Sequence, residues 1–205
     1  MNRFHIGLGT LGLAALLSVS ASAQTFNPAP LPEKVNGQLA DLGKKALAGD
    51  TNAQLRMGLA FEFGQGVDRD VDQAMRWYHM AADRGDPVAQ TDLAYLYETG
   101  SSGTPDPGEA AKWYLRAAVS GFARAQFNLG TLYLRGLGVE RSDDDAAHWI
   151  GEAADTGCPS AIAAMGYLYA NGKGVPHDEE KARKLIQKAA KKNDPRLCSS
   201  LSGPS

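Results

Sequence analysis

The chain lacks the sequence signatures on which the common enzyme and nucleic-acid-binding classes depend. Only 2 of its 205 residues are cysteine, and 21 Lys and Arg against 23 Asp and Glu give a formal net charge of −2. No S-x-x-K, G-x-S-x-G, H-E-x-x-H or Walker-type sequence occurs, so the usual nucleophile, zinc and phosphate signatures are missing. Nucleic-acid binding depends largely on an excess of positive charge that neutralises phosphates, and this chain has no such excess. We therefore expect a protein that is not an enzyme, uses no cofactor and binds no nucleic acid.

Long apolar stretches are also scarce, and the only one covers residues 6–19. It follows the basic residue Arg3 and precedes the small residues Ala21-Ser22-Ala23, which together are the three parts of a secretory signal. The stretch is shorter than the roughly 20 apolar residues that a transmembrane helix needs. We expect a signal peptide at residues 1–23, cleavage after Ala23, and a periplasmic or secreted protein without a membrane span. Residues 24–33 contain three prolines, which disfavour regular secondary structure, so we expect this segment to be a linker.

The rest of the chain repeats itself every 36 residues. Four segments align without a gap, and small and aromatic residues recur in each at the i, i+4, i+8 spacing of an amphipathic helix. A second helix in each repeat carries an alanine column, a column with tryptophan in three repeats, and an Ala-Ala pair. The tryptophans recur with the fold, so we interpret them as core. The sequence thus predicts an all-α fold with two helices in each of the repeats 49–84, 85–120, 121–156 and 157–192.

Both ends of the repeat array are expected to be atypical, because one face of each terminal unit meets water. Residues 34–48 resemble the end of a second helix, with Leu42 and Ala46 in the columns of Tyr78 and Ala82. They are predicted to form a capping helix at the amino end. Residues 193–205 begin like a fifth first helix and are predicted to form a truncated helix and tail.

One stretch, Leu132 to Ile150, invites a different interpretation, because a Gly-x-Gly loop is followed by three acids and a histidine. Gly136 and Gly138 recur in other repeats, where they would end the first helix and adopt positive φ angles. Ser142 occupies a column of good helix N-caps, which also contains Asp70, Asp106 and Asp178. A metal site at Asp144 and His148 would lack the three or four ligands that structural sites usually collect. We interpret the stretch as helix-capping architecture.

The repeat unit reads Ala-Gln…Leu-Gly…Leu-Tyr…Gly-x-Gly-Val and then Asp…Ala…Trp-Tyr…Ala-Ala…Gly. It resembles the Sel1-like repeat, a branch of the tetratricopeptide superfamily, over residues 49–192. The resemblance implies a right-handed α-solenoid of four 36-residue helix-turn-helix repeats, whose first helices line a concave surface. It also implies an adaptor or scaffold for a protein or peptide partner. Some cysteine-rich relatives are described as penicillin-binding or weak β-lactamases, but they carry a cysteine pair in every repeat. That activity stays an alternative.

Two smaller features leave alternatives open. Cys158 and Cys198 are the only cysteines of a chain that we expect to be exported, which favours a disulfide over two free thiols. Cα atoms more than about 7 Å apart would prevent this disulfide.

The last helix carries a basic cluster that could bind an anionic surface. Alternatively, its positive charges stabilise the helix, because cations near the carboxyl end interact favourably with the helix dipole. We prefer the second explanation for this cluster, which consists of Lys181, Arg183, Lys184, Lys188, Lys191 and Lys192.

The partner-binding residues are predicted from the face of each first helix that the resemblance turns toward the inner curve. These positions change chemistry from repeat to repeat, which packing alone would not demand. Aromatic anchors with charges around them suit an extended peptide or a partner helix, and we place Tyr95, Phe127 and Tyr167 at the centre. Alternatively, Leu55, Leu59 and Phe127 fill gaps between adjacent first helices. This first-helix face comprises Asn52, Leu55, Leu59, Glu62, Phe63, Thr91, Tyr95, Glu98, Arg124, Phe127, Thr131, Arg135, Ser160, Tyr167 and Asn171.

Overall fold

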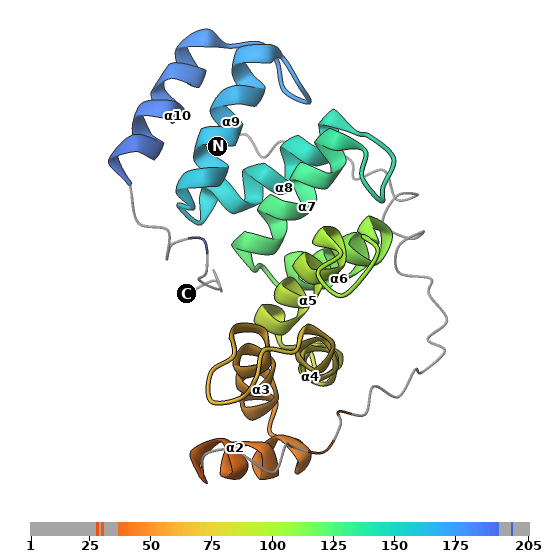
Figure 1. Ribbon diagram of the computed structural model, residues 1–205. Coiled ribbons are helices and arrows are strands. Elements are labelled where there is room, and N and C mark those ends of the chain that lie inside the picture. Colours follow the sequence, from red (N-terminus) through yellow and green to blue (C-terminus); the bar gives the residue numbers. More distant parts are fainter. Residues whose placement is uncertain (1–27, 29, 31–36, 193–197, 199–205) are drawn as a thin grey trace.

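The computed structural model describes Pro28, Pro30, residues 37–192 and Cys198. These residues contain nine helices and no strand (Figure 1), so the all-α prediction is confirmed. A single helix, α2, is followed by four helix pairs that form the repeats of an α-solenoid. The helices are α2 (Gly37–Leu47), α3 (Thr51–Phe63), α4 (Val71–Asp83), α5 (Pro87–Thr99), α6 (Pro107–Val119), α7 (Ala123–Arg135), α8 (Asp143–Asp155), α9 (Pro159–Asn171) and α10 (Glu179–Lys191).

Four predicted segments fall wholly or partly outside the described residues. The expected signal peptide, residues 1–23, lies entirely outside them, and only Pro28 and Pro30 of the expected linker lie within. The expected capping helix corresponds to α2, and the expected tail is described only at Cys198. Among the described residues, no helix combines the length and the apolar composition needed to cross a bilayer.

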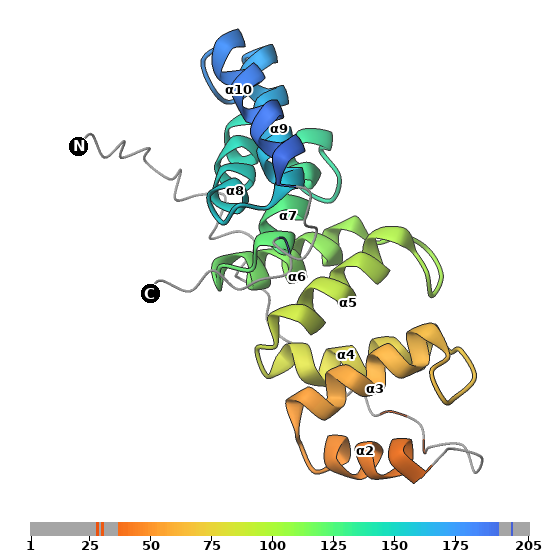
Figure 2. The same ribbon diagram turned by 90° about the vertical axis from the view of Figure 1, so that its left-hand side faces the viewer.

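The helix pairs stack in chain order, and each pair is rotated relative to the one before it. Figure 2 shows the stack from the side, with α2 at the bottom and the pair α9 and α10 at the top. In Figure 1, α3 and α5 lie to the left of α4 and α6, whereas α9 lies to the right of α10. A face built from the first helices therefore winds along the stack.

Local sequence signals explain where the helices begin and end. The four second helices begin at an N-cap side chain that accepts a hydrogen bond from the backbone N–H three residues on, at 2.9–3.1 Å. These N-caps are Asp70, Asp106, Ser142 and Asp178, as predicted. The four first helices end at a glycine in the left-handed region, with φ of 61–68°, including Gly136.

The second glycine of the loop connects neighbouring repeats. A Cβ at Gly138 would collide with the backbone carbonyl of Pro107 at the start of α6. In the second repeat, Ser102 stands at this position, and its hydroxyl donates a hydrogen bond to Asp72 on α4. The loop is therefore a contact between repeats, which agrees with an architectural role for the glycines.

Small residues bring the helices close together, and the tryptophans fill the space between them. The alanine columns are buried, and Trp77, Trp113 and Trp149 are 1%, 7% and 6% exposed. Their interpretation as core residues is confirmed. These side chains hold the stack together and are unavailable to a partner.

A buried glutamine bonds each of the first three repeats to the unit before it. The side-chain amide of Gln54 donates to the carbonyl of Ala46, at 2.9 Å. Gln90 bonds Ala82 in the same way at 2.9 Å, and Gln126 bonds Ala118 at 3.2 Å. Ala46 in α2 thus takes the place that Ala82 and Ala118 have at the ends of α4 and α6. This equivalence explains why α2 can cap the stack.

Candidate partner-binding face

The structure distributes the fifteen residues of the first-helix face over a wide range of exposure. Phe63, Tyr95 and Tyr167 are the most prominent, because 61%, 48% and 49% of their surface is exposed. Four polar members are also exposed, namely Asn52, Arg135, Ser160 and Asn171. Seven are half-buried, namely Leu55, Leu59, Glu62, Glu98, Arg124, Phe127 and Thr131.

Thr91 does not belong to an accessible face. Its side chain is fully buried, and its hydroxyl donates to the carbonyl of Pro87 one turn earlier in α5, at 2.7 Å. A threonine can satisfy its hydroxyl in this way inside a helix, so it can be packed between neighbouring helices. The prediction that Thr91 contacts a partner is corrected: the residue is buried inside the stack and a partner cannot reach it.

Two ion pairs connect α5 and α7 on this face. Arg124, at the start of α7, donates to Asp92 of α5 at 2.5 Å. Arg135, at the end of α7, lies 3.6 Å from Glu98, near the end of α5. Tyr95 lies one turn from both acids along α5, at i+3 from Asp92 and i−3 from Glu98. Its exposed ring is therefore placed between two contacts that hold the adjacent first helices together.

Asp92 is a member of this face that the sequence interpretation missed. It shares a column with Arg56, Asn128 and Ala164, and no common chemistry marks that column as important. Burial raises the pKa of its carboxyl group, although the guanidinium of Arg124 acts in the opposite direction. The informative signal would have been the pairing of its charge with Arg124, 32 residues further along the chain.

Two of the acids on this face, Glu62 and Glu98, have a role inside the repeats. The hydroxyl of Tyr78 donates to Glu62 at 2.5 Å, and that of Tyr114 donates to Glu98 at 3.0 Å. Burial is the main cause that raises the pKa of both tyrosine hydroxyls, and the neighbouring glutamate raises it further. Each pair joins the two helices of one repeat. In the third and fourth repeats, apolar pairs stand at the same positions, namely Leu134 with Ile150 and Ala170 with Ile186.

Three apolar members of the face pack against the core. Leu55 and Leu59 lie against the buried cluster of the amino-terminal repeats, and Phe127 lies against that of the carboxyl-terminal repeats. These three residues are therefore partly taken up by packing within the stack, and whether they fill gaps between first helices stays a prediction. Phe127 is less accessible than the two tyrosines with which the sequence interpretation grouped it.

Tyr167 stands among small side chains on α9. Ala163 and Ala170 beside it are exposed, and so are Ser160 and Asn171 one to two turns away. The ammonium group of Lys173 lies 5.1 Å from the centre of the tyrosine ring and donates to its hydroxyl at 3.1 Å. Even with this contact, 49% of the surface of Tyr167 is exposed.

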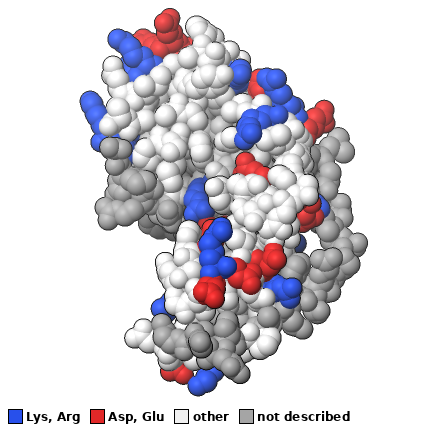
Figure 3. Space-filling model, viewed as in Figure 1, with Lys and Arg blue, Asp and Glu red and all other residues white. Residues whose placement is uncertain are grey.

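The basic cluster on α10 is exposed, and Ala182 is the only buried residue of that helix. Two of its lysines have partners within the protein. Lys181 lies 4.0 Å from the ring centre of Tyr169, and Lys184 pairs with Glu180 at 2.6 Å. In Figure 3, acidic residues lie close to basic ones near that end of the molecule and in the middle of the face in view. Neither region in that view is a patch of one charge.

The Asp144 and His148 segment shows no convergence of ligands. His148 is exposed and its ring lies edge-on to Trp149, with 4.9 Å between the ring centres. Within the part of the chain that the structure describes, no group of three or more His, Cys, Asp or Glu side chains could hold a metal ion.

The two cysteines form a disulfide in the structure. Cys158 is fully buried at the start of α9, and its Cα atom lies 4.5 Å from that of Cys198. Cys158 stands where the first two repeats have the capping residues Asp50 and Asp86, and its side chain makes no capping hydrogen bond. The bond attaches Cys198 to the last helix pair.

Comparison with known proteins supports this description of the repeats. The model of the Sel1 repeat matches residues 51–86, 87–121, 123–158 and 159–194. A protective antigen present in uropathogenic Escherichia coli strains, which displays an SLR fold, is 35% identical, with a TM-score of 0.74. That match covers 80% of this chain and 35% of the antigen. A Sel1 repeat protein from Oxalobacter formigenes is also 35% identical, with a TM-score of 0.70 and coverage of 76% and 45%.

This chain therefore spans less than half the length of either of those two proteins. No curated protein matches it. The match to the repeat model nevertheless extends through all four helix pairs, which is the part of the chain that builds the solenoid. The chain belongs to the Sel1-repeat family.

Proposed function

We propose that the protein is an exported, non-enzymatic scaffold that binds a peptide or protein partner on its first-helix face. Sel1-repeat proteins are generally protein-interaction scaffolds, which supports the general function. Export is supported by the signal-like sequence at residues 1–23. The partner would then be met in the periplasm or outside the cell.

The main observation in favour of this binding site is that Tyr95 and Tyr167 are exposed. They occupy the same repeat position two repeats apart, and about half of each side chain is exposed. Packing of the stack does not require an aromatic residue there, because Leu59 and Thr131 occupy the position in the other two repeats. Tyrosine combines a large apolar ring with a hydroxyl, and it is enriched among residues that dominate binding energy.

The neighbouring ion pairs favour a rigid site. The pairs Arg124–Asp92 and Arg135–Glu98 link α5 to α7 on both sides of Tyr95. A preformed site loses less conformational freedom when a partner binds, which increases affinity. An extended peptide or an amphipathic helix that crosses the first helices could contact both tyrosines.

A capture experiment tests this proposal. The purified protein is crosslinked in the native envelope fraction, and captured proteins are identified by mass spectrometry against a Tyr95→Ser, Tyr167→Ser variant. We expect partner capture to fall by roughly tenfold or more, the usual result of removing two central aromatic contacts. Phe127 is left unchanged, because its contact with the core would confuse a loss of binding with a loss of stability.

A matched control removes two exposed apolar side chains elsewhere. Leu47 and Val119 are 62% and 61% exposed and lie outside the first-helix face. The Leu47→Ser, Val119→Ser variant should capture the partner like the unaltered protein, and all three proteins should have the same helical circular dichroism. Equal capture by the tyrosine variant would exclude the first-helix face as the site.

A further inference from the structure

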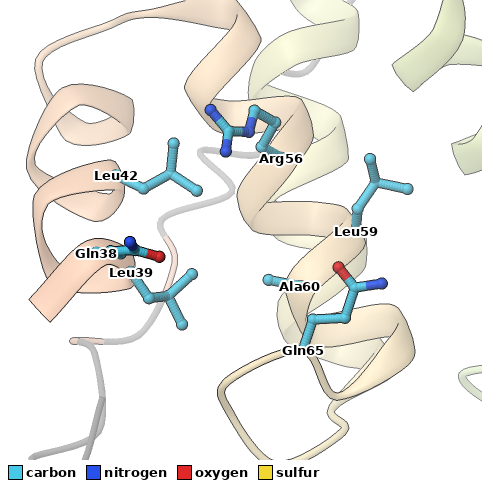
Figure 4. Close-up of a pocket in the computed structure, with 7 residues that line it drawn as sticks. All are labelled: Gln38, Leu39, Leu42, Arg56, Leu59, Ala60 and Gln65. Atoms are coloured by element: carbon cyan, nitrogen blue, oxygen red, sulfur yellow. The ribbon is translucent and has the colours of Figure 1, made fainter. Parts of the chain in front are cut away.

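A pocket of about 290 Å³ lies between α2 and α3, at the amino end of the stack (Figure 4). Its apolar lining consists of Leu39 and Leu42 from α2 and Leu59 and Ala60 from α3. Leu39 and Ala60 are 7% and 4% exposed, so they belong to the core and give the pocket a fixed wall. Its volume is near the lower end of ligand pockets, roughly 300–1,000 Å³, and suits one or two side chains.

The polar lining is on the exposed rim. Gln38 comes from α2, Arg56 from α3 and Gln65 from the turn after α3, and all three are exposed. Figure 4 shows the guanidinium group of Arg56 reaching from α3 toward α2, while Leu39 and Leu42 point from α2 toward α3. Among the described residues, no carboxylate forms an ion pair with Arg56. An apolar wall thus lies beside a cation whose charge is not neutralised there.

This combination is specific to the first repeat. The column of Arg56 contains Asp92, Asn128 and Ala164 in the other repeats, so packing of the stack does not require a cation. The neighbouring wall residue Leu59 has the repeat position of Tyr95 and Tyr167 and belongs to the first-helix face. The pocket therefore lies at the amino end of the face on which we propose that a partner binds.

We propose that this pocket receives an aliphatic side chain of the partner that is accompanied by a carboxylate. The aliphatic group contacts Leu39, Leu42 and Ala60, and the carboxylate accepts hydrogen bonds from Arg56. The guanidinium group suits this task because it presents several N–H donors in one plane. Gln38 and Gln65 can bond the backbone of the same segment. The inference rests on the proposed function, and it specifies the chemistry that one end of the partner must have.

A small probe with both groups is 4-methylpentanoate, and its uncharged counterpart is 4-methylpentanamide. Each is titrated into the ¹⁵N-labelled full-length protein, and the shifts of the backbone amide resonances are followed by NMR. We expect saturable shifts in α2 and α3, with dissociation constants on the order of millimolar for so small a ligand. The carboxylate should bind roughly threefold to fivefold more tightly than the amide, because its ion pair with Arg56 is exposed.

Three variants complete the test. Arg56→Gln should bind both probes with equal affinity, and Gln65→Trp, which fills the rim, should bind neither. Arg183→Gln makes the same chemical change on exposed α10 and should retain the preference for the carboxylate. Because no core residue is altered, these variants should keep the helical circular dichroism of the unaltered protein.

Several results would overturn the assignment. These are equal affinity of the unaltered protein for the two probes, shifts centred outside α2 and α3, or a preference for the carboxylate that persists in Arg56→Gln. The chain's own Leu31 and Glu33 offer the same chemistry. A fivefold or larger gain in affinity in a Leu31→Ser, Glu33→Gln variant would therefore overturn the assignment to a partner and give the pocket to this segment. Failure of the scaffold proposal would appear only in the capture experiment and would leave these titrations unchanged.

Discussion

His79 on α4 should make the stability of the fold depend on pH. Its side chain is only 4% exposed, and its Nε2 atom forms a hydrogen bond with the Tyr97 hydroxyl at 2.9 Å. The ring also packs edge-on against Trp113, with 5.4 Å between the ring centres. Burial lowers the pKa of His79 from 6.5 to about 4, and the positive charge of Arg116 acts in the same direction.

The sign of the effect follows from proton binding in the two states. Between pH 6.5 and about 4 the unfolded chain binds a proton at His79 and the folded chain does not. Stability therefore falls as the pH is lowered through this window. With these two pKa values, linkage predicts a loss of about 2 kcal/mol between pH 7 and pH 5, which grows to about 3 kcal/mol at pH 4.

Urea titrations at pH 7, 6 and 5 would measure this loss, with His79→Leu as the reference. The second repeat has Leu115 at the same position, so leucine suits the space. Burial raises the pKa values of Asp83 and Asp92 and so acts in the opposite sense, but both groups are present in both proteins. Their contributions cancel in the difference. If the two proteins lost the same free energy of unfolding between pH 7 and 5, the assignment of a neutral buried His79 would be refuted.

Two further predictions concern the core and surface columns of the repeat and the disulfide. Trp113→Ala should cost roughly 3–5 kcal/mol, the range for truncating a buried aromatic side chain, whereas His148→Ala should change stability by less than about 0.5 kcal/mol in the same urea titration. A larger loss for His148 would contradict the assignment of its column to the surface. Iodoacetamide should modify neither Cys158 nor Cys198 before reduction and both after it, and two modified thiols in unreduced exported protein would exclude the disulfide in the cell.

The arrangement of the helices could be predicted from the sequence because each repeat is an independent copy of the same local signals. The N-cap column predicts where the second helices begin, and the glycine column predicts where the first helices end. The burial of the tryptophan column follows from its recurrence. Four aligned copies average out the irregularities of any one repeat, such as the Ser101-Ser102 turn.

Accessibility within the first-helix face could not be predicted in the same way. One column contains Leu55, Thr91, Phe127 and Ala163, which are half-buried, buried, half-buried and exposed. Adjacent residues of a helix differ by only 100° in direction, so a column at the border between the core-facing and the exposed side of a first helix is neither clearly inside nor outside. Its exposure depends on the size of the neighbouring side chains. Repeat spacing carries no information about those neighbours, which explains the wrong placement of Thr91.

The acids on this face show why variable chemistry is weak evidence for recognition. Glu62 and Glu98 occupy the repeat position that holds Leu134 and Ala170 in the later repeats, so the chemistry at this position varies. Each glutamate nevertheless has a tyrosine partner in its own repeat. Where the glutamate is replaced by an apolar residue, the tyrosine is replaced by isoleucine as well, as in the later apolar pairs. Exchanging both partners avoids leaving a buried hydroxyl without its hydrogen bond, which would cost about 1–3 kcal/mol. Packing therefore explains this variation without a partner. Tyr95 and Tyr167 differ in that about half of each side chain is exposed, and the case for a binding face depends on them.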